Sequence, residues 1–308
     1  MGSTVSLVRA NESTEDIKKS IDRAVDLIKF KTVERVRSVV IKPNLCYYWD
    51  SSTGCTTDPR VVSGIIDVVR ERFGGDVDIK VAEADASAMR TKHAFPVLGY
   101  DRLAKEKEVE LFNLSSGLLL DKTVHVNGRE ISFKVPELLL KCDLFISVPK
   151  LKIMRATKIT CAMKNVFGCI GFPKKLVYHK FLDEAIVGIN KVLHPPLIIV
   201  DGLVGLGRFP AKLNLIMASN DVFSVDWVAS QIMGYRHASV RFLKLAKKEK
   251  VGDPKGIVTV GENVAEFARI FPKEGFVASR YLWGIQFWLL NAYRKVTGDI
   301  VPPVLEEA

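Results

Sequence analysis

Residues 161–180, "CAMKNVFGCIGFPKKLVYHK", combine side chains that could bind a metal, take part in redox chemistry or hold an anion. The segment carries two cysteines, four lysines and a histidine but no acidic residue. Cys161 and Cys169 are eight positions apart, unlike the tight C-x-x-C spacing of zinc and iron–sulfur sites. Cys46 and Cys55 are also loosely spaced, so we predict no metal site made by cysteines alone. Cys169 is either a buried, weakly reactive thiol or a thiolate that acts as nucleophile or ligand.

Positive charge is concentrated around this segment. The chain of 308 residues has a net charge of +10, and residues 141–180 contain nine lysines and arginines against one acid, Asp143. Proline, glycine and apolar residues interrupt this basic run, so it does not read as the solvated face of one helix. Such a concentration of charge suits phosphate, carboxylate or another anionic group.

Three residues of the segment are candidates for catalysis: His179, Lys164 and Cys169. His179 is the best acid–base candidate of the chain, and the surrounding lysines predict a neutral imidazole at pH 7. The alternative is an ordinary surface histidine. Lys164 and Asn165 lie in a short predicted helix that Gly168 ends, so they would stand together at one wall of a site.

Further polar residues follow the ends of buried strands. In open parallel sheets, ligands bind beyond the carboxyl ends of the strands. A lysine directly after a buried strand must reach water or meet an anion, because an unpaired buried charge is costly. Each such residue taken singly could be a turn or cap residue, but together they predict one cleft. Its predicted binding residues are Lys42, Asn44, Thr57, Glu83, Lys150, Lys152, Asn165, Asp201 and Gly202.

Short apolar runs alternate with helical patterns along the chain, which predicts an α/β fold. We expect a mostly parallel, Rossmann-like sheet flanked by helices. Ser13 and Asp58 are predicted N-caps, and Pro59 suits the first turn of the second helix. Asn127-Gly128 between two alternating runs predicts an inserted β-hairpin.

Residues 1–275 are predicted to form the α/β domain, either as one unit or as two lobes of about 1–140 and 141–275. Residues 276–308 contain an apolar segment shorter than the roughly 20 residues that span a bilayer. We predict a C-terminal helix that docks on the core, on a second subunit in a homodimer, or peripherally on a membrane.

Several common chemistries lack their motifs. The sequence has no G-x-S-x-G, H-E-x-x-H or C-x-x-C, and "VDGLVGLGRFPAK" matches neither the dinucleotide fingerprint nor the phosphate loop. Five cysteines and a polar start without a secretion signal predict a reducing, cytoplasmic location.

The strings "VVIKPNL", "TTDP", "SVPKLK", "MKNVFGC", "YHK", "IVDGLVGL" and "MASNDVFSVDWVASQIMG" occur in this order within residues 39–234. In this the chain resembles the family called domain of unknown function 362, also described as uncharacterised iron–sulfur centre proteins. The resemblance implies an α/β domain, often joined to a ferredoxin module, with a redox or cofactor-linked role. This sequence has no ferredoxin cysteine run, so we expect no cluster within the chain, and any electron donor would be a separate ferredoxin-like protein. A more distant similarity to lactate-racemase-like proteins, which use a nickel-pincer nucleotide, is one of fold.

We therefore predict a protein that binds an anionic small molecule or cofactor, of unknown identity, in a basic cleft. A redox- or cofactor-linked enzyme is the first hypothesis, and it requires a closed pocket where Lys42, Lys150 and His179 converge. A non-catalytic carrier or assembly factor for a cluster or cofactor is the second, and it requires Cys161 and Cys169 side by side and exposed. A nucleic-acid binder is the third, disfavoured because the basic segment has few aromatic residues.

Overall fold

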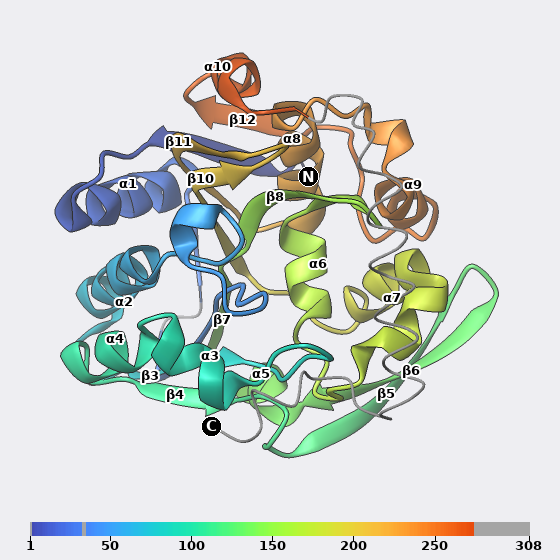
Figure 1. The fold of residues 1–308 in the computed structure, drawn as a ribbon, viewed down its shortest axis with the longest axis horizontal. Coiled ribbons are helices and arrows are strands. Elements are labelled where there is room, and N and C mark those ends of the chain that lie inside the picture. Colours follow the sequence, from blue (N-terminus) through green and yellow to red (C-terminus); the bar gives the residue numbers. More distant parts are fainter. Residues whose placement is uncertain (1, 33–34, 274–308) are drawn as a thin grey trace.

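The computed structural model describes residues 2–32 and 35–273, and within them one ten-stranded sheet runs through the molecule (Figure 1). The strand order is β12-β1-β11-β10-β7-β2-β3-β4, with β8 added beside β10 and β9 beside β8. The predicted α/β class with a mostly parallel sheet is confirmed, although β11 runs antiparallel to both β1 and β10. The strands are β1 (Thr4–Arg9), β2 (Ser38–Lys42), β3 (Asp78–Glu83), β4 (Glu110–Asn113), β7 (Leu144–Ser147), β8 (Lys150–Met154), β9 (Lys158–Thr160), β10 (Leu197–Leu206), β11 (Pro210–Ser219) and β12 (Val258–Gly261).

Helices cover both faces of the sheet (Figure 1). One face carries α1 (Thr14–Leu27), α2 (Pro59–Phe73), α3 (Thr91–Val97) and α4 (Tyr100–Glu106). The other carries α6 (Ala162–Phe167), α7 (Leu182–Ile189), α8 (Val222–Ile232) and α9 (Arg241–Lys248). The short helices α5 (Glu137–Lys141) and α10 (Val264–Ile270) complete the set, with 3₁₀ turns η1 (Ser51–Thr53), η2 (Lys175–Phe181) and η3 (His237–Ser239).

Two apolar cores follow from the alternation of side chains along each strand. In β10, Ile199 packs with α1 and α2 while its neighbour Val200 packs with the helices on the opposite face. In β7, Ile146 and Phe145 divide in the same way. Because both faces are covered, the central strands are apolar throughout, which explains their uninterrupted Val, Ile and Leu runs.

The predicted caps and hairpin are present. Ser13 and Asp58 accept hydrogen bonds from the first turns of α1 and α2, and Pro59 begins α2. The hairpin joins β5 (Leu119–Val126) to β6 (Arg129–Pro136). Asn127 and Gly128 take φ of 52° and 78°, the left-handed conformations that a two-residue type I′ turn requires. The hairpin forms its own two-stranded sheet, which packs against α7 (Figure 1).

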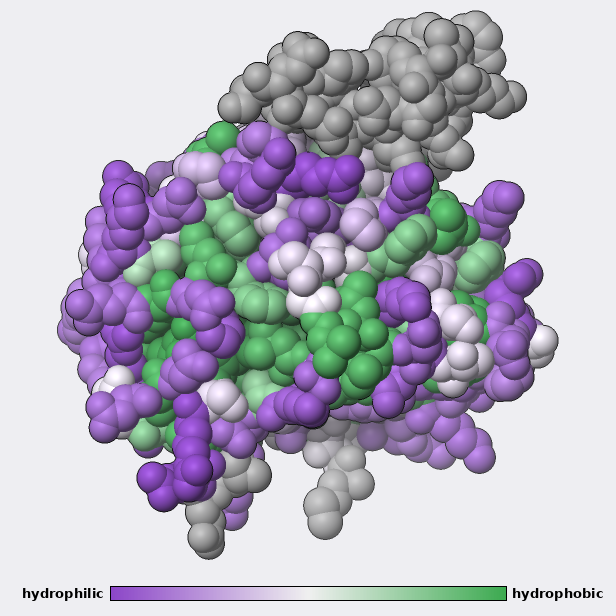
Figure 2. All heavy atoms as spheres, turned by 90° about the horizontal axis from the view of Figure 1, so that it is seen from below, coloured by the Kyte–Doolittle hydropathy of each residue, from purple (hydrophilic) through white to green (hydrophobic). Residues whose placement is uncertain are grey.

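The face around the hairpin is not uniformly polar. Leu118, which precedes β5, is 63% exposed, and Leu140 in α5 is 37% exposed. Figure 2, which views the molecule from this side, shows apolar side chains gathered among hydrophilic ones. Apolar and hydrophilic side chains are therefore mixed on this face of the molecule.

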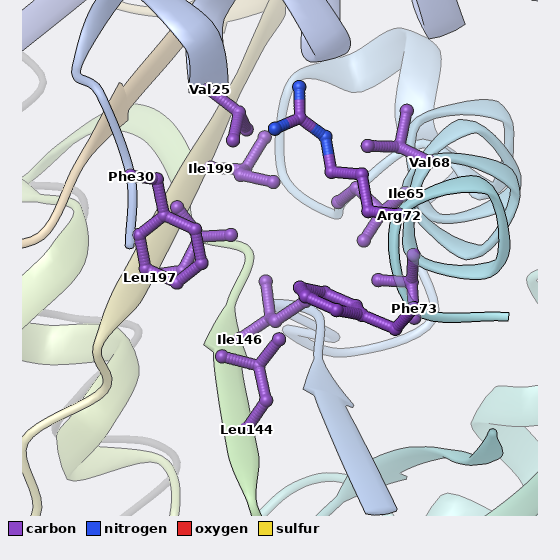
Figure 3. A pocket seen from close by; sticks show the side chains of 11 residues that line it. Val25, Phe30, Ile65, Val68, Arg72, Phe73, Leu144, Ile146, Leu197 and Ile199 are labelled. Carbon is purple, nitrogen blue, oxygen red and sulfur yellow. The ribbon is translucent and has the colours of Figure 1, made fainter. Parts of the chain in front are cut away.

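A small apolar cavity lies between α1, α2 and the beginnings of β7 and β10 (Figure 3). Its volume is about 10 Å³, and its walls include Phe30, Ile146 and Ile199. A space of this size holds at most one water, and apolar walls give that water no partner. The cavity is therefore a packing defect at the amino ends of the strands and not a ligand site.

Strands from both halves of the chain share the main sheet, as the pairing of β1 with β11 shows. The predicted helix of residues 276–308, with its docking and membrane alternatives, lies outside the described residues. In the part of the chain that the structure describes, none of the helices has the length and hydrophobicity needed to traverse a membrane.

Candidate functional site

Lys42 ends β2 and is buried, as its position after an apolar strand predicts. Its ammonium group lies 2.8 Å and 2.9 Å from the two carboxylate oxygens of Glu83, which ends the neighbouring parallel strand β3. It also donates to the carbonyl of Pro43 at 2.8 Å and to Oδ1 of Asn165 at 3.2 Å. The anion that meets this lysine is thus supplied by the protein itself. The Lys42–Glu83 ion pair links the ends of β2 and β3.

A second internal ion pair joins Lys150 to Asp201 at 2.8 Å, with both side chains fully buried. Asp201 was expected just past the end of a strand, but β10 continues to Leu206, so the carboxylate lies inside the strand opposite Lys150. It also accepts the backbone N–H groups of Asp58 at 2.7 Å and Leu203 at 3.0 Å. Asp201 therefore fixes the start of α2 to the sheet.

Gly202, predicted to contact a cofactor, lies in β10 beside β11. A Cβ at this position would come within 2.8 Å of the carbonyl oxygen of Leu215, closer than real Cβ contacts allow. Glycine is therefore required here for the close approach of two strands. This packing requirement explains why position 202 is a glycine, and no contact with a cofactor is needed to explain it.

Two asparagine side chains link the strand ends into one network. Asn165 Oδ1 accepts from Lys42 and, at 3.3 Å, from Nδ2 of Asn44, while its own Nδ2 donates to Ser147 Oγ at 3.0 Å. Asn44 Oδ1 accepts from Lys152 Nζ at 2.7 Å. These contacts join side chains that are far apart in the sequence into one hydrogen-bonded network.

Thr57 belongs to the same network through its hydroxyl group. Its Oγ1 accepts from the backbone N–H of Asn44 at 2.8 Å and donates to the carbonyl of Val148 at 2.9 Å. The fully buried Tyr100 donates its hydroxyl to the Thr57 carbonyl at 2.9 Å. Both hydrogen-bonding functions of the Thr57 hydroxyl are therefore used within the protein.

The charge of Lys152 acts on Lys164, and both lysines lack a counter-ion among the described residues. Lys152 is 3% exposed and donates to Asn44 Oδ1 and to the carbonyl of Cys55, each at 2.7 Å. Lys164, partly buried on α6, stacks over Phe167 at 5.9 Å. No carboxylate of residues 2–32 or 35–273 forms an ion pair with either lysine. This contrasts with Lys42 and Lys150, whose charges are matched inside the fold.

Burial is the main cause that lowers the pKa of Lys164, to about 8. The sulfur of Cys46 opposes this change, and the charge of Lys152 adds to it. Since an ordinary lysine has a pKa near 10.4, Lys164 loses its proton at a lower pH than an exposed lysine, although at pH 7 it is still mainly protonated. The site thus contains both a fixed cation and an amine that can change its charge.

Lys175 is a buried lysine that the sequence analysis did not select. It is 6% exposed and donates to the carbonyls of Asp85 at 2.8 Å and Gly168 at 2.9 Å. Burial lowers the pKa of Lys175 to about 8, opposed by Glu83. It follows an exposed lysine, Lys174, and a Lys-Lys pair gives no signal of which member is buried.

His179 lies at the exposed side of the site, in η2. Burial of part of the ring lowers the pKa of His179, and the charge of Lys164 lowers it further, which favours the neutral imidazole near pH 7. The side chain lines an open hollow of about 390 Å³. The other lining residues are Ala156, Lys180, Phe181, Leu182, Asp183, Glu184 and Arg241.

Cys169 does not fit the proposed thiolate role, because it is fully buried beneath α6. Burial raises the pKa of the Cys169 thiol to about 12, and Sγ donates weakly to the Asn165 carbonyl at 3.9 Å. Cys161 is also fully buried, and burial raises the pKa of its thiol well above the usual value. In the described ranges, no group of three or more His, Cys, Asp or Glu side chains is arranged to hold a metal.

We expect alkylation to separate these cysteines by exposure. At pH 8 iodoacetamide should modify the half-buried Cys46 and Cys55 first, because thiolate and access control reactivity. Cys161 and Cys169 should react at least about 100-fold more slowly in the folded protein, given their burial and raised pKa values. Peptide mass spectrometry over time measures this order. Early modification of Cys169, absent in the Cys169→Ser control, would show that Cys169 is a reactive thiol after all.

Asp226 positions α6 and was not predicted. This fully buried carboxyl on α8 accepts the backbone N–H groups of Ala162 at 2.6 Å and Met163 at 3.1 Å, the first two residues of α6. Burial raises the pKa of Asp226 to about 7. A usable signal was present: an acid in the middle of the apolar helical run "VFSVDWVASQI" must find buried donors.

The fold and this network define an α/β protein with a lysine-rich polar site, built from β2, β3, β8, β10 and α6. The family model of the domain of unknown function 362 matches residues 39–231, and the chain belongs to this family. Every residue predicted for the site lies inside that match.

Two known proteins are similar to parts of the chain. The thylakoid-associated protein sll1697 of Synechocystis sp. is 27% identical over 227 residues, which is 70% of this chain and 68% of that protein. The lactate racemase apoprotein of Thermoanaerobacterium thermosaccharolyticum aligns over 78% of this chain and 56% of its own, with a TM-score of 0.37 and 13% identity. The chain thus spans just over half of that structure.

Proposed function

We propose that this protein binds an anionic ligand or cofactor through Lys152 and Lys164, as part of a cofactor-linked enzyme. The observation that carries the proposal is the pair of neighbouring lysines without a counter-ion among the described residues. Two like charges in a partly dry site repel each other, and an anion between them replaces repulsion with two attractive contacts. Phosphate or carboxylate is the ligand group that this arrangement fits.

The proposed site is smaller than the general basic cleft that the sequence predicts. Lys42 and Lys150 are neutralised by Glu83 and Asp201, so they would support the site and not contact the ligand. Asn44 would orient Lys152, whose ammonium group has donated to two acceptors and has a third N–H remaining. His179, whose pKa is lowered by burial and by the charge of Lys164, would exchange a proton with the bound ligand.

Lys42 and Lys150 lie in separate buried ion pairs, and neither lines the hollow of His179, so these three side chains do not converge as the enzyme hypothesis expected. The geometry also gives little support to the two alternatives. A carrier of a cluster needs accessible thiols side by side, whereas Cys161 and Cys169 are both fully buried. A nucleic-acid binder needs its cations on an open face, whereas Lys42, Lys150 and Lys152 are enclosed. A cytoplasmic location, a homodimer and a separate ferredoxin-like partner remain predictions. The printed name of the Synechocystis relative associates that protein with thylakoids.

Inorganic phosphate and pyrophosphate are the probes that test this site. We expect either anion to raise the melting temperature of the wild-type protein, because a ligand that binds only the folded state stabilises it. Lys152→Met and Lys164→Met should each weaken binding at least about 10-fold, since each removes a charge-assisted contact worth roughly 1.5–3 kcal/mol.

The matched control is Lys174→Met, which removes one positive charge from an exposed position in the same segment. It should leave binding within about twofold of wild type, because an exposed charge is screened by salt. Sodium chloride at equal ionic strength separates specific binding from a general salt effect. Equal loss of binding in all three variants, or stabilisation by chloride alone, would refute a site at Lys152 and Lys164.

A further inference from the structure

The loop of residues 43–58, which joins β2 to α2, exposes two aromatic rings to solvent. Tyr47 is 49% exposed and Trp49 is 57% exposed. Tyr48 between them differs, because its hydroxyl accepts the backbone N–H of Arg90 at 2.9 Å and its ring packs against the core beneath α2. Among the described residues, the side chains of Tyr47 and Trp49 make no hydrogen bond and no ring contact. These two rings are therefore not needed to hold the loop in place.

The backbone that carries Trp49 is fixed by contacts on two sides. Thr56 Oγ1 donates to the carbonyl of Trp49 at 2.5 Å. Gly54 has a φ of 73°, and a Cβ there would lie only 3.0 Å from Cβ of Leu206 at the end of β10. The loop thus packs closely on the sheet, and the exposed indole stands on a rigid base.

Tyr47 has an unusual backbone conformation. Its φ is 62°, in the left-handed region that bulky side chains seldom adopt. Such a conformation persists only where the surrounding structure holds it, and residues of this kind concentrate at ligand-binding sites. The loop also follows the carboxyl end of β2, the edge of an open α/β sheet at which ligands bind.

The same loop holds Lys152, the buried cation of the proposed anion site. Nζ of Lys152 donates to Asn44 Oδ1 and to the carbonyl of Cys55, each at 2.7 Å, and these acceptors lie near the two ends of the loop. Cys55 is followed by Thr56, whose hydroxyl holds the backbone of Trp49. A short series of contacts therefore leads from the ammonium group to the exposed indole, and an anion at Lys152 lies at the base of the loop that carries the rings.

We propose that Tyr47 and Trp49 bind an aromatic ring of the ligand whose anionic group is held at Lys152, an inference that rests on the proposed anion site. Flat rings stack on exposed tyrosine and tryptophan side chains with little sequence or shape requirement beyond a π face. The ligand class is a planar ring that a short spacer joins to a phosphate or carboxylate group.

Two pairs of phosphate monoesters test this inference at two spacer lengths. Phenyl phosphate is compared with methyl phosphate, and adenosine 5′-monophosphate is compared with ribose 5-phosphate, so each pair differs by one ring. We expect the ring to strengthen binding at least about 10-fold in one pair or both, because a stacked ring contributes at least that factor. Isothermal titration calorimetry at fixed ionic strength measures the four dissociation constants.

Three variants assign this gain to the loop. Trp49→Ala and Tyr47→Asn should each remove most of the gain, and asparagine is chosen because it tolerates a positive φ. Both variants should bind methyl phosphate and ribose 5-phosphate within about twofold of wild type, since these probes have no ring to lose. Phe209→Ala, which removes an aromatic ring that is 58% exposed in the β10–β11 turn, is the matched control and should leave all four constants unchanged.

The outcomes separate this inference from the proposed function. Equal binding of the two members in both pairs would overturn the aromatic site and leave the anion site standing. Absence of binding by all four monoesters, inorganic phosphate and pyrophosphate would overturn the proposed function and this inference with it. A similar loss of the gain in Phe209→Ala, or loss of methyl phosphate binding in Trp49→Ala, would show that Tyr47 and Trp49 do not form a specific site for the ring.

Discussion

Replacement of Lys150 by methionine should lower the free energy of unfolding by about 3–5 kcal/mol. The ammonium group and Asp201 are both fully buried and 2.8 Å apart. Removal of the lysine leaves the carboxylate without a cation, held only by the backbone N–H groups of Asp58 and Leu203. A buried charge without its partner costs more than the pair contributes.

Chemical denaturation of three variants checks this expectation. Lys150→Met combined with Asp201→Asn should recover about 1–2 kcal/mol of the loss, because no uncompensated charge remains. Lys212→Met is the matched control, since Lys212 pairs with Glu12 on the surface, where both side chains are more than half exposed. It should change stability by less than about 0.5 kcal/mol. A Lys150→Met effect as small as that control would show that Asp201 does not depend on its lysine.

The same two ion pairs explain how far the sequence predicts this site. Lysines after apolar strands had to meet an anion, and that expectation placed Lys42 correctly at the end of β2, whereas Lys150 begins a further strand, β8. Glu83 was selected by the same rule. The rule could not tell that Lys42 and Glu83 meet each other, because the side-by-side order of β2 and β3 is a property of the sheet. Local pattern identifies polar residues, but strand order decides whether they face a ligand or one another.

The helix α6 shows a second limit of prediction from sequence, which concerns contacts between distant segments. Its sequence predicted a short helix ended by Gly168, with Lys164 and Asn165 at the site, and the structure has that helix. The residue that holds its first turn, Asp226, comes from α8, more than sixty positions away. Contacts across such a distance depend on packing of two helices on one face of the sheet, which no spacing in the sequence encodes.

Replacement of Asp226 by alanine should destabilise the protein by about 2–4 kcal/mol, because two buried N–H groups of α6 lose their acceptors. The loss should also weaken phosphate binding, since α6 carries Lys164. Thermal or urea unfolding measures the first effect and phosphate titration the second. An alanine variant as stable as wild type would mean that water or another group satisfies these donors.

The Asp226→Asn variant isolates the charge of this carboxyl group. Burial raises the pKa of Asp226 to about 7 in the folded protein, against about 3.9 in an unfolded chain. The folded state thus favours the protonated form, so this contribution to stability is full below pH 4 and is lost as pH rises towards 7. The slope is at most about 1.4 kcal/mol per pH unit.

Because asparagine cannot ionise, Asp226→Asn should gain stability relative to wild type between pH 5 and pH 7 and show a constant difference above about pH 8. Urea unfolding at pH 5, 6, 7 and 8 on both proteins measures this difference directly. A difference that does not change with pH would mean that the hydrogen bonds from Ala162 and Met163 keep the carboxylate ionised despite its burial. In that case the two N–H groups, and not desolvation, would govern the charge beneath α6, and the helix that carries Lys164 would rest on a permanent anion.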